Sequence, residues 1–119
     1  MDASELMQRY ADEERDFAQV DLSQANLSEA ILNQINLSGA NLSKTNFHKA
    51  HLVDANLSNA DLSTAYLTET QLQGANLQAT NLHKADLGRA NLKSANLTNA
   101  ELDGANLRSA TMPDGTISD

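Results

Sequence analysis

The chain has 119 residues, no cysteine and a formal net charge of −8. The lack of cysteine excludes a disulfide framework and thiolate chemistry, and the length predicts one domain with one core. The charge is unevenly placed. Residues 1–21 hold seven acids and two bases, whereas residues 22–110 hold seven acids and six bases. Phosphate binding requires clustered Lys and Arg, so this nearly neutral body excludes direct nucleic-acid binding.

Residues 1–14 are expected to form a helix that covers one end of the domain. Asp2 and Glu5 have the spacing of a capping box, and four residues fall on one face of the helix: Leu6, Met7, Tyr10 and Ala11. No long apolar run occurs in this segment, so we expect neither a secretory signal nor a membrane span. These features favour a cytoplasmic protein without membrane contact.

From residue 15 onward the sequence repeats with a period of five. Positions 17, 22 and so on to 107 are nineteen sites, of which seventeen are Leu and two are Phe17 and Phe47. The residue two before each site is mostly small, with thirteen Ala and three Thr among the nineteen, and the others are Arg15, Val20 and Ile35. The residue between them is Asn or Asp at fourteen of the nineteen sites. The repeating unit is therefore Ala-Asn/Asp-Leu-x-x.

This period fits neither an α-helix nor a long flat strand. In a helix a step of five residues would scatter the leucines around the axis. In a continuous strand the same step would place successive leucines on opposite faces. A short extended piece followed by two turning residues solves both problems, with Ala and Leu inward and Asn or Asp outward. The sequence therefore predicts an all-β solenoid.

The runs Ala25-Asn26-Leu27-Ser28-Glu29 and Ala40-Asn41-Leu42-Ser43-Lys44 resemble the pentapeptide-repeat proteins. Residues 10–17 and 112–116 are similar to the two ends of the repeat region in cyanobacterial members. The resemblance implies a right-handed quadrilateral β-helix over residues 15–114, with four pentapeptides per coil, about five coils and a tail at 115–119. The expected core includes Phe17, Leu22, Leu27, Leu37, Leu42, Phe47, Leu57, Leu62, Leu77 and Leu97.

The C-terminal end is expected to be less well protected than the N-terminal end. The five-residue register continues weakly through Met112 and Ile117, while Pro113 lacks an amide donor and Asp114-Gly115 favours a turn. The resemblance implies pairing through this end in some members. Monomer and end-to-end homodimer are both compatible with the sequence.

A candidate partner patch lies where the middle position departs from Asn or Asp. With twenty residues per coil, Ile31, His51 and Gln71 would stack in one outward column, joined by Val53 and flanked by Tyr66. The alternative interpretation is tolerance of scattered apolar residues at a surface. A neighbouring column alternates in charge and is expected to form an exposed ladder of weak pairs: Glu29, Lys49, Glu69 and Arg89.

No constellation of catalytic, cofactor-binding or metal-binding residues is recognised. A rod with a filled core is expected to offer no concave site, and His48, His51 and His83 lack a metal-ligand spacing or Cys partners. The sequence thus favours a non-catalytic scaffold or protein-protein interaction module with an unidentified protein partner. The resemblance implies one alternative, a DNA mimic that binds a type II topoisomerase, although the nearly neutral body argues against acidic rows.

Overall fold

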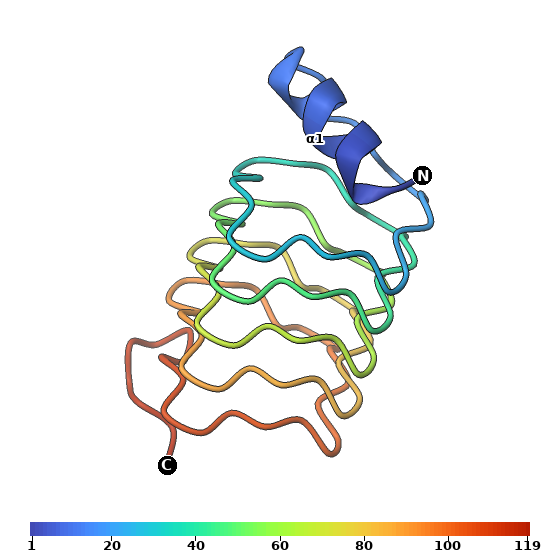
Figure 1. Cartoon of the computed structure of the whole chain (residues 1–119). Helices are drawn as coiled ribbons and strands as arrows, with labels where there is room; N and C mark the ends of the chain where they lie inside the picture. Colours follow the sequence, from blue (N-terminus) through green and yellow to red (C-terminus); the bar gives the residue numbers. More distant parts are fainter.

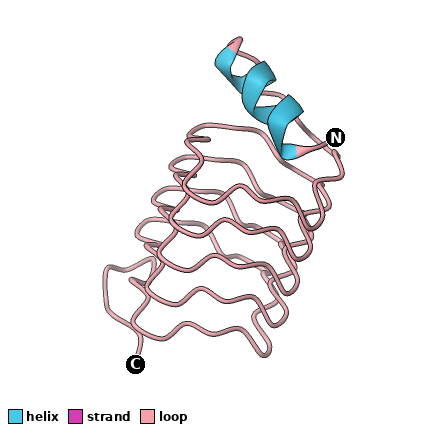
Figure 2. Cartoon of the chain, in the orientation of Figure 1, coloured by secondary structure: helices cyan, strands magenta, loops and turns pink.

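The computed structural model describes residues 1–119 as one short helix on a stack of coils. Helix α1 (Ala3–Ala11) lies across one end, and the rest of the chain winds beneath it into a rod (Figure 1). The molecule measures 38 × 22 × 21 Å along its principal axes. No continuous strand is drawn in Figure 2, because β pairing is confined to isolated single residues. The nine-residue helix is too short to cross a membrane.

Parallel pairing between residues twenty apart sets the register of the rod. The series begins with Asp16 opposite Asn36 and ends with Asn91 opposite Thr111, without a break. Since each repeat has five residues, four pentapeptides separate two paired residues. The solenoid and its short N-terminal helix are thus confirmed.

Each repeat ends in a hydrogen-bonded turn that changes the direction of the chain. The N–H of the small residue bonds to the carbonyl of the preceding Leu, as for Ala55 to Leu52 at 3.1 Å. The residue just before the small residue has positive φ in every repeat, for example 60° at Asn59. Positive φ at that position alone is the mark of a type II turn, which favours glycine. Only Gly39, Gly74 and Gly104 meet this preference.

Every backbone N–H of a typical repeat has a partner, as residues 55–59 illustrate. Asn56 N–H bonds to Ile35 O of one neighbouring coil at 2.9 Å. Leu57 and Asn59 N–H bond to Asn76 O and Gln78 O of the other neighbouring coil, at 2.8 and 2.9 Å. Buried or half-buried backbone groups require such partners, so the interval of five residues is set by hydrogen bonding as well as by packing.

The remaining N–H, on the residue after each Leu, explains the Asn and Asp residues. At each of the fourteen middle positions that hold Asn or Asp, the side-chain Oδ1 accepts this N–H. For example, Asn56 Oδ1 accepts the N–H of Ser58 at 3.0 Å. Asn and Asp have the side-chain length that this Asx turn requires. At Asp21, hydrogen bonds from the N–H and the hydroxyl of Ser23 lower the pKa of the carboxyl.

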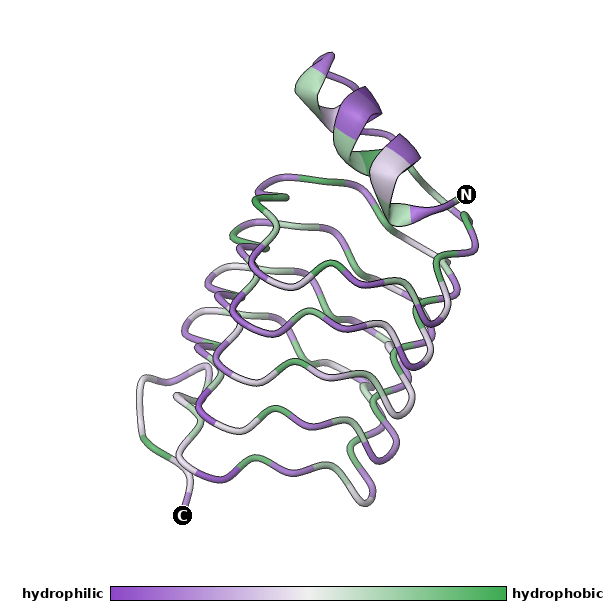
Figure 3. Ribbon diagram, in the orientation of Figure 1, coloured by the Kyte–Doolittle hydropathy of each residue, from purple (hydrophilic) through white to green (hydrophobic).

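The leucine column is buried from Phe17 to Leu92 and half-buried at Leu97, Leu102 and Leu107, and Figure 3 shows apolar segments recurring along every coil. Nine of the ten predicted core residues are buried, but Leu97 is half-buried because no further coil covers it. Three Thr residues at the small position are buried, and each hydroxyl donates to a carbonyl of the preceding coil at 2.7–2.8 Å: Thr45, Thr70 and Thr80.

Helix α1 covers the first coil much as expected. Asp2 accepts the N–H of Glu5 at 2.8 Å, but the Glu5 carboxylate turns to Arg9 at 3.4 Å, so only half of the capping box forms. Leu6 is buried, and Met7 and Tyr10 pack on the core. The prediction for Ala11 is wrong, because the helix ends there and its side chain is exposed.

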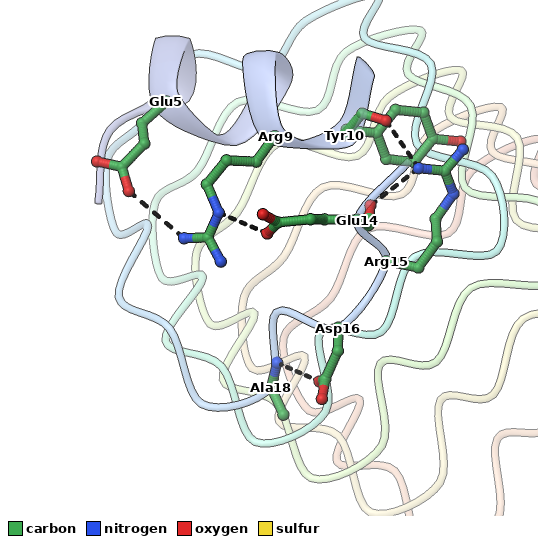
Figure 4. Close-up of polar contacts among 7 residues, drawn as sticks. All are labelled: Glu5, Arg9, Tyr10, Glu14, Arg15, Asp16 and Ala18. Atoms are coloured by element: carbon green, nitrogen blue, oxygen red, sulfur yellow. Dashed lines mark hydrogen bonds and ion pairs between the residues drawn. The ribbon is translucent and has the colours of Figure 1, made fainter. Parts of the chain in front are cut away.

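Two arginines fasten the helix to the rod (Figure 4). Arg9 pairs with Glu14 at 2.6 Å and lies over the Phe17 ring at 4.9 Å. Arg15 stacks on the Tyr10 ring at 3.6 Å and donates to the Tyr10 carbonyl at 2.8 Å. The cap is therefore held by charge and aromatic contacts together with Leu6.

The C-terminal end folds back instead of continuing the register. Thr111 pairs antiparallel with Ile117, and Ser118 N–H bonds to Ala110 O at 2.8 Å. Gly115, with a φ of 87°, provides the turn, and the prediction that Ile117 continues the core register is wrong, because its side chain is 62% exposed. The tail thus covers only part of the last coil.

The buried column gives a first prediction. Leu62→Lys should unfold the rod, because it loses roughly 1.5–3 kcal/mol of burial and places a charge without a partner in the core. Circular dichroism during heating should show no cooperative transition. Gln78→Lys, at an exposed site, should melt like the wild type; a folded Leu62→Lys protein with unchanged Tm would contradict the inward placement of Leu62.

The turns give a second prediction. Ala79 has a φ of 56° and no polar side chain. Ala79→Gly should raise the free energy of unfolding by about 0.5–1 kcal/mol, because relief of left-handed strain, about 1–2 kcal/mol, exceeds the entropy cost of glycine. Urea denaturation measures this gain. Gln78→Gly, one residue earlier in the same turn, should instead lower stability, and equal effects of the two substitutions would refute the assignment.

Candidate functional site

Two neighbouring ladders and the turns that join them form one corner of the rod. The first, the Tyr66 ladder, consists of Asn26, Asn46, Tyr66, Asp86 and Asn106. The second, the His51 ladder, follows five residues later and consists of Ile31, His51, Gln71, Asn91 and Thr111. The residues between the two ladders, such as 68–69 and 88–89, make the corner itself.

The structure brings four of the five predicted patch residues to this corner, whereas Val53 follows His51 and lies at the next corner of the coil. Ile31 pairs with His51 and His51 with Gln71, so these three occupy successive coils on one ladder. Tyr66 lies on the other side of the corner, five residues before Gln71. Ile31 and Tyr66 are 57% and 55% exposed, which is high for large apolar side chains. Val53 is half-buried.

The patch interrupts the Asx turns that stabilise the other repeats. Five middle positions lack Asn or Asp, and four of them belong to the patch: Ile31, His51, Tyr66 and Gln71. At His51 the loss is compensated, because Asn33 Oδ1 accepts the Val53 N–H at 3.0 Å. Gln71 does not replace the missing bond, because its Oε1 accepts from the Gln73 side chain at 2.7 Å. The repeats that lack an Asx hydrogen bond from their middle residue therefore lie mainly at one corner.

The predicted charge ladder has the expected register but forms no ion pairs. Glu29, Lys49, Glu69 and Arg89 follow one another every twenty residues, each with positive φ. The chain's ion pairs lie elsewhere, between Arg9 and two glutamates and between His83 and Asp103. Charges at exposed turns are well solvated, so holding long side chains in pairs contributes little.

The histidines have separate surroundings. His48 lies in the corner and its Nδ1 is 2.5 Å from Thr68 Oγ1, whereas His83 Nδ1 is 2.5 Å from Asp103 Oδ2. His51 stays in the ladder of the patch. No group of three His, Cys, Asp or Glu residues is close enough to hold a metal ion.

A polar cleft of about 340 Å³ lies along the corner, contrary to the expectation of a surface without concave sites. It is lined by His48, Thr68, Glu69, Asp86, Gly88, Arg89, Asn106, Arg108 and Ser109. The cleft exists because Gly88 stands between Thr68 and Arg108 in one column and has no side chain to fill the gap. We refer to this site as the corner cleft.

Sequence reasoning missed the corner cleft, although one signal pointed to it. Gly88 is the only glycine among the nineteen residues that follow the Leu or Phe of each repeat. Its φ is not positive, so the backbone does not require glycine there. A glycine without a conformational reason marks a place where space is needed.

A rod of paired pentapeptides around a leucine column, with most of its departures from Asn or Asp at one outward corner, defines a β-solenoid. The pentapeptide-repeat family model matches residues 21–59, 45–83 and 75–113. The chain belongs to the pentapeptide-repeat family. Among curated protein sequences none matches it.

Solved structures of the same family are similar over most of the chain. A pentapeptide repeat protein from the Arabidopsis thaliana thylakoid lumen is 30% identical with a TM-score of 0.63, over 87% of this chain and 69% of that one. Rfr23 from the cyanobacterium Cyanothece is 29% identical with a TM-score of 0.56, over 98% of this chain and 100% of that one. A Nostoc pentapeptide repeat protein is 38% identical with a TM-score of 0.53, over 92% and 78%.

The missing Asx turns give a third prediction. Tyr66→Asn should raise the free energy of unfolding by about 0.5–1 kcal/mol, because the new Oδ1 can accept the Thr68 N–H. Chemical denaturation of the two proteins measures the difference. Tyr66→Gln is the matched control, since its longer side chain cannot close the same turn and should bring no gain. A Tyr66→Asn protein less stable than the wild type would mean that Tyr66 has a structural role.

Proposed function

We propose that this chain is a non-catalytic interaction module, a right-handed rod of about five coils, that binds a protein partner through Ile31, His51, Val53, Tyr66 and Gln71. One observation carries the proposal: four of the five middle positions without Asn or Asp gather at one corner. If residues other than Asn or Asp were simply tolerated at any exposed middle position, they would be spread over all four faces. Real proteins deviate from locally stabilising choices chiefly where function requires it.

The chemistry of the patch supports a protein partner. Tyr66 and Ile31 offer apolar area beside the amide of Gln71 and the ring of His51, and none of the five is an acid, Lys or Arg. Tyrosine is enriched among the residues that dominate binding energy at protein interfaces. An uncharged, partly apolar patch on a chain of net charge −8 suits a partner surface of similar character.

A role as a duplex mimic for a type II topoisomerase has less support from this surface. Such mimicry needs continuous acidic rows, whereas the body carries six bases: Lys44, Lys49, Lys84, Arg89, Lys93 and Arg108. Arg89 and Arg108 line the corner cleft itself. The acids are concentrated at the N-terminal cap instead.

Affinity capture with a stabilised variant tests the proposed function. The wild-type chain and an Ile31→Asn, Tyr66→Asn double variant are immobilised and exposed to an extract of the source cells. Proteins enriched on the wild type should be lost from the double variant. Because both substitutions restore Asx turns, this loss cannot be ascribed to unfolding, which a thermal melt verifies.

Glu101→Asn provides the matched control for this experiment. Glu101 is the fifth departure, and it lies two pentapeptides from the His51 ladder along the coil, on another face. Its substitution should leave the captured proteins unchanged. If the double variant retained the same proteins as the wild type, the patch would have no part in binding.

A further inference from the structure

The corner cleft contains two arginines whose side chains have no partner. Arg89 and Arg108 line it from successive coils, and neither guanidinium takes part in an ion pair or a side-chain hydrogen bond. The other two arginines, Arg9 and Arg15, are held by carboxylates, carbonyls and aromatic rings. The side-chain N–H donors of the two cleft arginines therefore have no partner within the protein.

The acidic residues of the corner cleft leave these donors available. Asp86 Oδ1 already accepts the Gly88 N–H at 3.0 Å and Asn106 Nδ2 at 2.9 Å. Glu69 lies one coil from Arg89 in the same column, without an ion pair to it. The lining residues are thus ordered along the rod axis, with Glu69 on the coil of Tyr66 and with Arg89 and Arg108 on the next two coils toward the C-terminal end.

Gly88 keeps the space between these groups open. A Cβ at this residue would lie 3.2 Å from Asp86 Oδ1 and 3.4 Å from Asn106 Nδ2, so any side chain would crowd the floor of the cleft. The other eighteen repeats all carry a side chain at this position, which is Ala, Ser, Thr, Asn, Asp, Gln, His, Val, Lys or Arg. The glycine therefore serves the cleft and not the turn.

We propose that the corner cleft binds an oxyanion, a carboxylate or a phosphate, carried on a peptide segment of a protein partner. A guanidinium donates two parallel N–H bonds to such a group, which makes arginine the preferred side chain for carboxylate and phosphate recognition. The open cleft, about 340 Å³, admits an extended peptide lying along the rod. Tyr66 precedes Asp86 on the same ladder and offers an aromatic surface at the Glu69 end.

This inference goes beyond the proposed function, because none of the cleft-lining residues belongs to the patch. Patch and cleft flank the same corner, so one partner can contact both. The patch and the cleft nevertheless consist of different residues, so separate variants test them.

Nuclear magnetic resonance titration of the intact, ¹⁵N-labelled chain tests the cleft. Three synthetic peptides of five residues serve as probes. They are glycine peptides that differ only in the central residue, which is glutamate, phosphoserine or glutamine. Inorganic phosphate is the fourth probe. The glutamate or the phosphoserine peptide should shift the amide signals of Gly88, Arg89 and Arg108 in a saturable manner. The glutamine peptide should not, and the two acidic peptides distinguish the carboxylate from the phosphate.

Matched variants assign the binding to the two arginines. Arg89→Gln with Arg108→Gln should lower the peptide affinity by about tenfold for each arginine removed. Lys84→Gln with Lys93→Gln removes the same charge from residues outside the cleft and should leave the affinity unchanged. Gly88→Gln keeps both arginines but fills the floor, and it should also weaken binding by about tenfold or more. The amide spectrum of each variant reports whether it is folded.

Several results would overturn the proposal. Equal shifts with the glutamine peptide would show that the oxyanion is not recognised, and an equal loss in the lysine variant would show attraction by overall charge. Shifts with inorganic phosphate and with neither acidic peptide would exclude a peptide ligand. Failure of the capture experiment would leave these results intact, since the peptides report on the cleft alone.

Discussion

The hydrogen bonds between successive coils are the constraint on which this structure depends. They hold residues twenty apart in parallel pairs, so the chain must return to the same direction after every four pentapeptides. Each turn therefore has to be equivalent, even where this places lysine, glutamate or threonine at positive φ. The strain at sixteen such non-glycine turns, Gln19 to Ser109, is tolerated because inter-coil bonds and the buried leucines on either side hold the backbone in place.

The same constraint decides where side chains are free to vary. The leucine and the small residue fill the core, and the middle residue of most repeats closes an Asx turn. Replacing Asn by Ile or Tyr at this middle position removes the Asx hydrogen bond but does not disturb the stack. Information about function is therefore expected at middle positions that lack Asn or Asp, and four of the five lie around one corner.

This corner combines two kinds of surface within one stretch of the rod. The patch around Tyr66 and Ile31 is exposed and uncharged, whereas the corner cleft beside it is polar and contains two unpaired arginines. Protein interfaces commonly join an apolar centre to polar contacts that confer specificity. The ladder opposite the Tyr66 ladder, from Asp16 to Asn96, keeps all five of its Asx turns and shows neither feature.

The sequence by itself determined the repeat, the inward leucines, the outward Asn and Asp and the N-terminal helix. These follow from contacts within five residues, which local patterns record. The register of twenty came from the family resemblance, because a period of five does not state how many repeats complete a coil. Only the tertiary structure decided that Leu97 is half-buried, that Ile117 points outward and that Gly88 opens a cleft. Each of these depends on which residues lie on the adjacent coil, twenty positions away in the sequence, or on whether an adjacent coil covers the residue at all. A pattern within five residues records neither.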